Sequence, residues 1–312
     1  MDFKVCAVLP AAGCGQRMGT NTPKQFSYLL GRPLISYCLE SFERVPWISD
    51  IVVTVSPEGI ESMQDIVSRF NHKRVTLVAG ASVRHRSIYN GVKALNKVSP
   101  EVVIVHDAVR PFVDEDTLRE VSLAAWEYGS SGAVRPLVST VIATDLDGFL
   151  DHSLDRSKYR SSEMPQAFCY DILCEAYQKA TDYDFDYGTE CLHLVNKYTA
   201  ARTRLIEGPE HLWKVTYKKD MFALEGLLKE HENSVGVFCC DPGGFERLYQ
   251  DCCNSSVYEG LYCGRHPKRT DGNKQFCVYN NLRLCQVLFL PLRCSATETA
   301  QLKPRRNTGL CS

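Results

Sequence analysis

Four apolar runs, separated by amphipathic segments, dominate the first 230 residues of the chain. They are KVCAVL (4–9), DIVVTVS (50–56), RVTLVAG (74–80) and EVVIVHD (101–107), and each shows little alternation between apolar and polar positions. Continuous apolar strands of this kind are typical of a parallel sheet that is covered on both faces. The pattern therefore predicts the buried strands of such a sheet.

The segments between these runs follow a helical period. In PLISYCLESF the apolar residues recur at helical spacing behind Pro33, which suits the first turn of a helix. RSIYNGVKAL and DEDTLREVSLAAWEYG read the same way, and the second has acids in its first turn and Gly129 at its end. Alternating βα units predict an α/β fold with a doubly wound, mostly parallel, Rossmann-like sheet. Ligands of such sheets bind at the carboxyl ends of the strands, near a topological switch point.

Two later stretches depart from this rhythm. Residues 137–163 alternate weakly around the turn signal DLDG, which predicts a projecting β-arm. Such arms commonly pair with a second subunit, so we expect a homodimer. The α/β pattern resumes with AFCYDILCEAYQKA and defines a domain over 1–235. Residues 236–312 are rich in Cys, Gly and polar residues, and we expect a Cys-rich tail without an assignable fold, either a small module or a poorly ordered region.

Composition and charge limit the partners and the location of the protein. The 312 residues include 36 Lys and Arg against 37 Asp and Glu, which argues against nucleic acid as a partner. The start MDFKVCAVLP lacks the pattern of a signal peptide, and no run reaches the ~18 apolar residues of a membrane span. We therefore expect a cytosolic protein without a membrane partner. The scattered cysteines before residue 239 predict buried thiols, and the absence of Cys-x-x-Cys argues against a zinc knuckle.

The turn after the first strand, PAAGCGQRM, has the chemistry of an anion site. The dinucleotide fingerprint G-x-G-x-x-G fails because Met18 stands where the third glycine is required, and no Gly-Lys-Ser/Thr follows as in a Walker A loop. The small residues 11–15 nevertheless allow backbone N–H groups to approach phosphate oxygens closely. Arg17 and Lys24 could bracket a polyphosphate. The alternative is a tight turn with solvated cations.

Three further stretches carry candidate binding residues. VAGASVRHRSIYNG places Gly80, Arg84 and Ser87 where a loop becomes a helix. VIVHDAVRPF ends a buried strand in Asp107, which suits Mg²⁺ or, alternatively, a helix cap or a salt bridge with Arg110. Arg156 and Lys214 follow in the later half of the chain, where solvation is the usual fate of such side chains.

Together these stretches resemble a known family. PAAGCGQRM, TPKQF, HDAVRP and WKVT occur in the order of the signatures of the IspD/TarI-like cytidylyltransferases, over about residues 4–230. The resemblance implies that CTP is bound by a Gly-rich loop and a cytosine-reading segment, which match Ala11, Ala12, Gly13, Cys14, Gly15, Gly80, Arg84 and Ser87. It implies Mg²⁺ at Asp107 and catalytic cations at Arg17, Lys24, Arg156 and Lys214, with Arg156 supplied by the partner subunit.

The chain departs from the family pattern mostly in the part that would bind the second substrate. One extra residue separates Gly80 from Arg84, Met164 replaces the threonine of T-P-Q, and Glu190 alone remains of an acidic pair. His85 and His106 are expected to be structural rather than catalytic.

The second substrate follows from the branch of the family. VRHRSIYNGVKAL and EMPQAF look most like the animal members, which use D-ribitol 5-phosphate. The resemblance therefore implies formation of CDP-ribitol and pyrophosphate, for the O-mannosyl glycan of dystroglycan. One alternative is 2-C-methyl-D-erythritol 4-phosphate, as in the bacterial isoprenoid enzymes, and another is an inactive nucleotide-binding or scaffold protein. The failed fingerprints disfavour a nicotinamide-dependent oxidoreductase.

Overall fold

The computed structural model describes residues 1–13, 22–232, 236–240 and 275–279. Contacts within the chain divide it into two units, Met1–Glu225 and Gly226–Ser312. In the second unit β12 (Gly236–Cys240) pairs antiparallel with β13 (Gln275–Tyr279), and the rest of the predicted tail lies outside the described residues. Among the described residues, no helix has both the length and the apolar character needed to cross a membrane.

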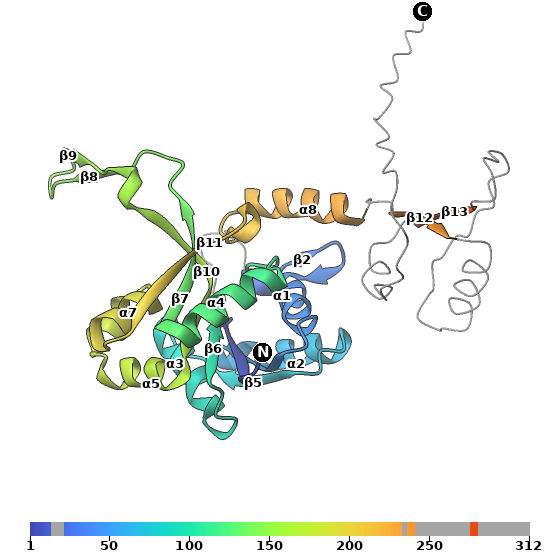
Figure 1. Ribbon diagram of the computed structural model, residues 1–312, viewed down its shortest axis with the longest axis horizontal. Coiled ribbons are helices and arrows are strands. Elements are labelled where there is room, and N and C mark those ends of the chain that lie inside the picture. The colour runs from blue at the N-terminus through green and yellow to red at the C-terminus, as the bar shows by residue number, and fades with distance from the viewer. Residues whose placement is uncertain (14–21, 233–235, 241–274, 280–312) are drawn as a thin grey trace, which may run out of the picture. The chain divides into compact units, whose positions relative to one another are not determined.

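The first unit is built on a seven-stranded sheet with the order β11-β7-β10-β6-β1-β4-β5 (Figure 1). Neighbouring strands pair in parallel, except that β10 runs antiparallel to both β6 and β7. The doubly wound, mostly parallel sheet that the apolar runs predict is therefore confirmed. The strands are β1 (Val5–Pro10), β4 (Ile48–Val55), β5 (Val75–Ala79), β6 (Val102–Val105), β7 (Gly129–Pro136), β10 (Arg160–Cys169) and β11 (Arg202–Glu207).

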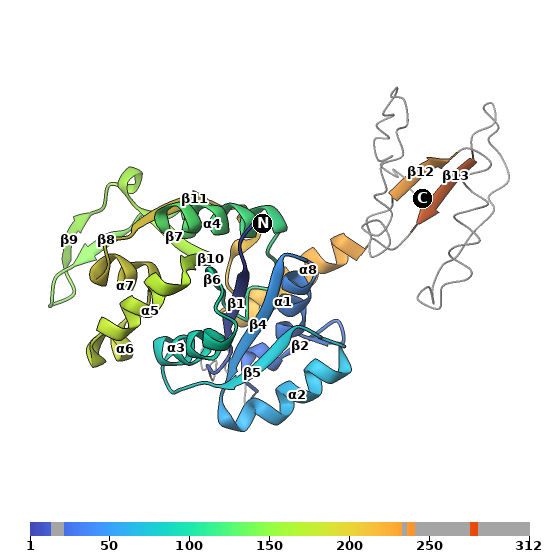
Figure 2. The same ribbon diagram turned by 60° about the horizontal axis from the view of Figure 1, so that its bottom comes forward.

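Helices cover both faces of this sheet, as the unbroken apolar strands require. Alternate residues of β1 enter two separate apolar clusters, one on each face. The first cluster contains α1 (Leu34–Glu43), α2 (Ile60–Arg69) and α4 (Glu115–Tyr128). The second contains α3 (Arg84–Ala94), α5 (Tyr170–Lys179) and α7 (Cys191–Tyr198), which lie together in Figure 2. The short α6 (Asp182–Tyr187) and the final α8 (Lys218–Glu232) complete the helices of the described chain.

Local sequence explains where several elements begin and end. Asp114 caps α4 by accepting a hydrogen bond from the backbone N–H of Thr117 at 2.7 Å, and Gly129 ends the helix with a positive φ of 97°. A capping box between Thr181 and Asp184 starts α6, which the polar sequence DYDFDY did not predict. β7 was also missed, because GSSGAVRP lacks the large apolar residues of the other strands.

The strand order reverses beside β1, which makes this part of the sheet a topological switch point. The chain passes from β1 outward to β4 and β5, and then returns to β6 on the other side of β1. Beyond the carboxyl end of β1 comes the glycine loop, and beyond that of β6 come His106 and Asp107. Open α/β sheets bind their ligands in the crevice that such a reversal creates. The two most informative motifs of the sequence therefore meet where a ligand is expected.

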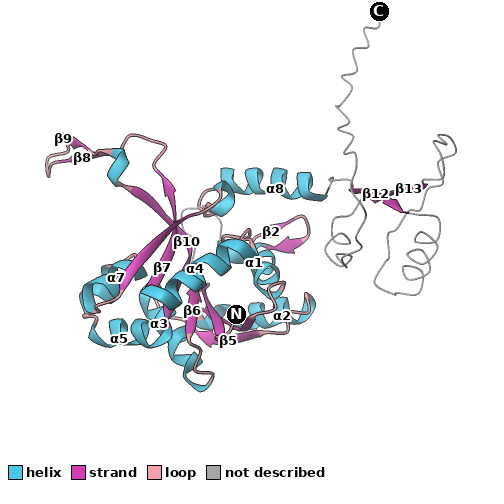
Figure 3. Cartoon of the chain, in the orientation of Figure 1, coloured by secondary structure: helices cyan, strands magenta, loops and turns pink. Residues whose placement is uncertain are grey.

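The β-arm is present between β7 and β10 (Figure 3). Its tip is the hairpin of β8 (Ile142–Thr144) and β9 (Leu150–Ser153), closed by the predicted DLDG turn. In that turn Asp145 Oδ1 accepts a hydrogen bond from the N–H of Phe149 at 2.8 Å, and Gly148 has a positive φ of 88°. Val138, Leu146 and Phe149 are strongly exposed on the arm. A second small hairpin, β2 (Tyr28–Leu29) and β3 (Arg32–Pro33), follows the glycine loop.

Candidate active site

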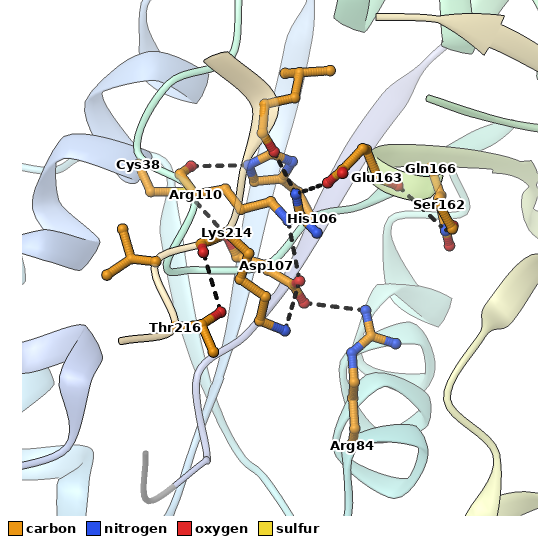
Figure 4. A network of polar contacts seen from close by, with 12 residues as sticks. Cys38, Arg84, His106, Asp107, Arg110, Ser162, Glu163, Gln166, Lys214 and Thr216 are labelled. Carbon is orange, nitrogen blue, oxygen red and sulfur yellow. Dashed lines mark hydrogen bonds and ion pairs between the residues drawn. The ribbon is translucent and has the colours of Figure 1, made fainter. Parts of the chain in front are cut away.

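The candidate site is organised around the buried carboxylate of Asp107, which three cations contact (Figure 4). Arg84 Nη2 lies 3.1 Å from Oδ1, while Arg110 Nε and Lys214 Nζ lie 3.3 and 3.0 Å from Oδ2. The cations come from the start of α3, the loop after β6 and the segment before α8. The structure thus brings together Arg84, Asp107 and Lys214, which the sequence marked separately. We call Arg84, Asp107, Arg110 and Lys214 the cation cluster.

The cluster fixes the ionisation of its carboxylate. Burial alone would raise the pKa of Asp107, but the charges of Arg84, Lys214 and Arg110 outweigh it and hold the pKa well below its usual range. Burial of Arg84 would lower its pKa, but the neighbouring charge of Asp107 outweighs this effect and raises the pKa. The Asp107 carboxylate and the Arg84 guanidinium are therefore both charged at neutral pH. The Lys214 and Arg84 side chains are 32% and 25% exposed and that of Arg110 only 8%, so Lys214 and Arg84 are the cations of the cluster that a ligand could reach directly.

The structure contains the Asp107–Arg110 salt bridge that the sequence offered as an alternative. Arg110 also holds the cluster to the rest of the domain, a role that the sequence did not predict. Besides Asp107, it contacts the carboxylate of Glu163 on β10 and donates to the backbone carbonyl of Leu212. Its own carbonyl oxygen lies 3.0 Å from Nε2 of His106. HDAVRP contains this arginine, so the motif was the available signal. Its partner Glu163 could be found only from the pairing of β10 with the sheet.

The predicted cytosine-reading segment packs directly against the glycine loop. A Cβ on Gly80 would lie 2.6 Å from Cβ of Ala12 and 3.2 Å from Oγ of Ser87, so a side chain at residue 80 would separate the two segments. The N–H of Gly80 is bonded to the carbonyl of Val55 at 2.7 Å. Ser87 Oγ accepts from the N–H of Ala81 at 2.9 Å and so holds the turn into α3. Gly80 and Ala12 therefore pack against each other, and the buried Ser87 supports the turn beneath them.

Gln25 and Lys24 connect the glycine loop to its surroundings. The buried Gln25 donates to the carbonyls of Ala11 and Gly13 at 2.7 and 3.0 Å, a role for the glutamine of PKQ that the sequence analysis did not assign. Lys24 Nζ donates to the carbonyl of Val215 at 3.1 Å, next to Lys214. The predicted loop residues Cys14, Gly15 and Arg17 lie outside the described residues.

Arg156 is not brought to the cation cluster of its own chain by the described contacts. It lies at the start of a short 3-10 turn on the arm, is exposed, and donates to the carbonyl of Val138 at 2.8 Å. A role for Arg156 in substrate binding would therefore require the arm to reach another molecule.

The two histidines near the site are buried and structural in character. The His106 ring is fully buried and tilted against Phe42 at a ring-centroid distance of 5.1 Å, and burial lowers its pKa to about 4. His85 follows Arg84 in the chain; its Nδ1 lies 3.0 Å from the Tyr177 hydroxyl, and burial lowers its pKa to about 4 as well. Neutral His106 can donate from Nε2 to the carbonyl of Arg110, which positions that loop. These contacts support a structural reading of both rings.

These histidines give the folded protein a specific acid sensitivity. An unfolded histidine takes up a proton near pH 6.5, whereas folded His106 does so only near pH 4. Because the unfolded state binds more protons between these values, the free energy of unfolding should fall as the pH drops from 6.5 towards 4. His106→Gln keeps a donor for the Arg110 carbonyl but has no group that titrates. The slope of the unfolding free energy against pH should therefore fall by up to the value for one proton, roughly 1.4 kcal/mol per pH unit. Urea unfolding followed by tryptophan fluorescence across this range measures both slopes, and equal slopes would contradict the assignment.

A second polar arrangement outside the cluster has the geometry of a Ser–His–Glu triad. Ser36 Oγ lies 2.8 Å from His72 Nε2, and His72 Nδ1 lies 2.6 Å from Glu43 Oε2. Ser36 is completely buried, however, and its Oγ also accepts from Arg32 Nε at 2.8 Å. A nucleophile must be reachable by its substrate. We therefore interpret this arrangement as a structural link between α1 and the segment before β5, not as a hydrolytic site.

Comparisons with known proteins agree with the fold and the motifs. A mouse (Mus musculus) D-ribitol-5-phosphate cytidylyltransferase is 58% identical over 233 residues, 72% of this chain and 52% of that protein. The 2-C-methyl-D-erythritol 4-phosphate cytidylyltransferase of Clostridium acetobutylicum is 32% identical over 228 residues, 72% of this chain and 98% of that protein. The chain spans about half the length of the curated animal relatives that it matches.

The solved structures and the family model extend this agreement. The crystal structure of 4-diphosphocytidyl-2C-methyl-D-erythritol synthase from Anaerococcus prevotii covers 73% of this chain and 96% of its own, with a TM-score of 0.63 and 24% identity, and supports the fold alone. The model of the family described as IspD, 2-C-methyl-D-erythritol 4-phosphate cytidylyltransferase, matches residues 5–230. Because this model matches most of the chain and the relative from Clostridium acetobutylicum is 32% identical, the chain belongs to the IspD family of cytidylyltransferases.

Proposed function

We propose that this protein transfers the cytidylyl group of CTP to D-ribitol 5-phosphate and forms CDP-ribitol and pyrophosphate. The observation that carries the proposal is the cation cluster at the switch point of the sheet, beside the two segments that match CTP-binding motifs. The identity of 58% to a mouse D-ribitol-5-phosphate cytidylyltransferase, against 32% to a bacterial relative named for methylerythritol phosphate, favours ribitol phosphate. On the same resemblance, we propose a cytosolic reaction whose product serves the glycan of dystroglycan.

The chemistry suits cations better than a general base. A polyol phosphate carries about 1.5–2 negative charges at neutral pH, so its oxygen is already nucleophilic. This oxygen attacks the α-phosphorus of CTP, and a new P–O bond forms. The bond from the α-phosphorus to the oxygen that bridges to the β-phosphate breaks, and pyrophosphate leaves with the electron pair. The obstacle is repulsion between two anions, which the charges of Arg84, Arg110 and Lys214 reduce while they orient the phosphates.

We propose Mg²⁺ as the metal that accompanies CTP, with Asp107 as its contact on the protein. Within the described chain, no group of three or more His, Cys, Asp or Glu side chains is arranged to hold a metal alone. Mg²⁺ in nucleotide sites is commonly held by one or two carboxylates together with phosphates, so a single carboxylate fits. A carboxylate has about four lone-pair positions, and the three cations leave room for a further ligand. When bound, the metal would add positive charge at the phosphates.

We further propose a homodimer in which the arm of one subunit brings Arg156 to the other. The exposed apolar side chains at the tip of the arm support this proposal, because Leu146 and Phe149 are fully and 71% exposed. Leu146→Asp combined with Phe149→Asp should convert a dimer into a monomer in equilibrium sedimentation, since burying two carboxylates in an apolar contact is costly. Leu123→Asp, at an exposed apolar position on α4, is the matched control and should stay dimeric. A monomeric wild-type protein would contradict the proposal.

The decisive test of function is a pyrophosphate-release assay on the full chain. CTP, the other nucleoside triphosphates, D-ribitol 5-phosphate and 2-C-methyl-D-erythritol 4-phosphate are tested in all pairs with Mg²⁺, and the nucleotide product is identified by mass. We expect release only with CTP, and a larger kcat/KM for ribitol phosphate. A preference for methylerythritol phosphate would replace the proposed substrate, and a folded protein without turnover would overturn the proposal.

A further inference from the structure

Arg84 has a second anchor besides Asp107. Its Nη2 lies 3.1 Å from Asp107 Oδ1, and its Nη1 donates to Sγ of Cys191 at 3.8 Å. Cys191 Sγ lies 3.6 Å from the hydroxyl oxygen of Tyr177, which in turn lies 3.0 Å from Nδ1 of His85. We call Arg84, Cys191, Tyr177 and His85 the Tyr177 network.

The network joins three helices of the second apolar cluster. Arg84 and His85 begin α3, Tyr177 lies on α5, and α7 begins at Cys191. The side chains of Cys191, Tyr177 and His85 are at most 1% exposed. The Tyr177 ring also stacks on the ring of Tyr89, with their centroids 5.0 Å apart. The position of the Tyr177 hydroxyl is therefore fixed by packing.

The three buried members of the network are uncharged at neutral pH. Burial raises the pKa of the Cys191 thiol and of the Tyr177 hydroxyl, so both groups keep their hydrogens. Burial lowers the pKa of His85 to about 4, so its ring is neutral. Because a guanidinium only donates, Cys191 Sγ accepts from Arg84. The Cys191 S–H can then donate to the Tyr177 oxygen, and the Tyr177 O–H can donate to His85.

Two anchors on different nitrogens fix the plane of the Arg84 guanidinium. Asp107 alone would hold one nitrogen, and the planar group could turn about that contact. The contact of Nη1 with Cys191 removes this freedom. A guanidinium has further N–H groups beyond the two used here, and the side chain is 25% exposed. The network therefore presents the remaining N–H groups of Arg84 to a ligand in one orientation.

We propose that Tyr177 is a positioning residue for nucleotide binding, which holds Arg84 through Cys191 in the orientation that CTP meets. This inference rests on the proposed function, in which Arg84 belongs to the segment matched to cytosine reading. Tyr177 and Cys191 are buried, so they act through Arg84 rather than on the substrate. They restrict Arg84 before CTP arrives, and this preorganisation strengthens binding because less freedom is lost on association.

The test is Tyr177→Phe in the full chain, which removes the hydroxyl and keeps the stacked ring. CTP binding is measured by isothermal titration calorimetry with Mg²⁺ and without polyol phosphate. We expect Kd for CTP to rise roughly 2- to 10-fold, as for loss of one buried hydrogen bond, while KM for D-ribitol 5-phosphate at saturating CTP stays that of the wild type. An unchanged Kd, or an equal rise in that KM, would overturn the proposal.

Tyr170→Phe is the matched control for a general loosening of α5. The Tyr170 hydroxyl lies on the same helix and donates to the carbonyl of Val92 at 3.1 Å, and within the described chain it has no contact with Arg84. This variant also loses one hydroxyl from a buried ring, so its melting temperature should fall by a similar amount. Its Kd for CTP should nevertheless match the wild type. If both variants weaken CTP binding equally, the role of Tyr177 is structural only and the proposal fails.

Cys191 provides an independent test that leaves Tyr177 in place. Cys191→Ser keeps a hydrogen-bond donor and an acceptor, whereas Cys191→Ala keeps neither. The serine variant should therefore bind CTP more tightly than the alanine variant, and equal affinities would overturn the link through Cys191. If the wild-type protein binds no CTP, it is the proposed function that fails.

Discussion

Replacing Lys214 with alanine is expected to lower kcat/KM for the proposed formation of CDP-ribitol by about 100- to 1,000-fold, as for loss of one preorganised charge-stabilising donor. Lys214 Nζ lies 3.0 Å from Asp107, and its side chain is 32% exposed, so it can turn towards a bound phosphate. The loss should appear in kcat as well as in KM, because the excess negative charge is greatest when the two phosphates meet. Single-turnover measurements with saturating CTP separate the two effects.

Two further variants make this result specific. Lys214→Arg keeps the charge but changes the geometry, and should recover part of the activity. Lys218→Ala removes an exposed lysine at the start of α8 and should be indistinguishable from the wild type. Full activity of Lys214→Ala, with an unchanged melting temperature, would remove Lys214 from the proposed mechanism.

Asp107→Ala is expected to have the largest effect on stability, a loss of about 3 kcal/mol in the free energy of unfolding. The substitution leaves three cations near one another without their shared counter-charge, although the partial exposure of Arg84 and Lys214 moderates the cost. Urea unfolding at neutral pH and low salt measures the change. Added pyrophosphate should stabilise the variant more than the wild type, because an anion can replace the missing carboxylate.

The control for this measurement is Asp65→Ala on the exposed side of α2, which should stay within about 0.5 kcal/mol of the wild type. Asp107→Asn should lie between the two, since it keeps the size and an acceptor oxygen. The pKa of Asp107 is far below its ordinary value, so its contribution is complete above about pH 4 and is lost only as the pH falls further. If Asp107→Ala is as stable as Asp65→Ala, the carboxylate does not balance the cluster.

The sequence predicted the sheet and part of the site because both depend on local patterns. Unbroken apolar runs predicted the buried strands. The glycine loop follows one of these strands, β1, and Asp107 follows another, β6. Since carboxyl ends of parallel strands meet at one edge, the proximity of these motifs followed from the fold class. The family motifs singled out Arg84 and Lys214, and the structure joins both to Asp107.

Other parts of the site depend on pairings that no local pattern contains. Glu163 meets Arg110 only because β10 enters the sheet antiparallel between β6 and β7. β7 itself escaped notice because Ser130 and Ser131 are small polar residues, although both are completely buried. Ser162 and Gln166 link β10 to Glu190 at the start of α7, and these contacts follow from packing rather than from sequence spacing.

The shared carboxylate of the cation cluster has a consequence for competition among cellular anions. In the free protein Arg84, Arg110 and Lys214 already share the counter-ion Asp107. A small anion that binds one of these cations replaces one ion pair with another, so its net free energy of binding is small. A polyphosphate that reaches several cations at once gains from each further contact without a new loss of translational freedom. Inorganic phosphate should therefore be a poor inhibitor relative to pyrophosphate. By pairing with these cations, Asp107 raises the concentration of inorganic phosphate that is needed to occupy the site.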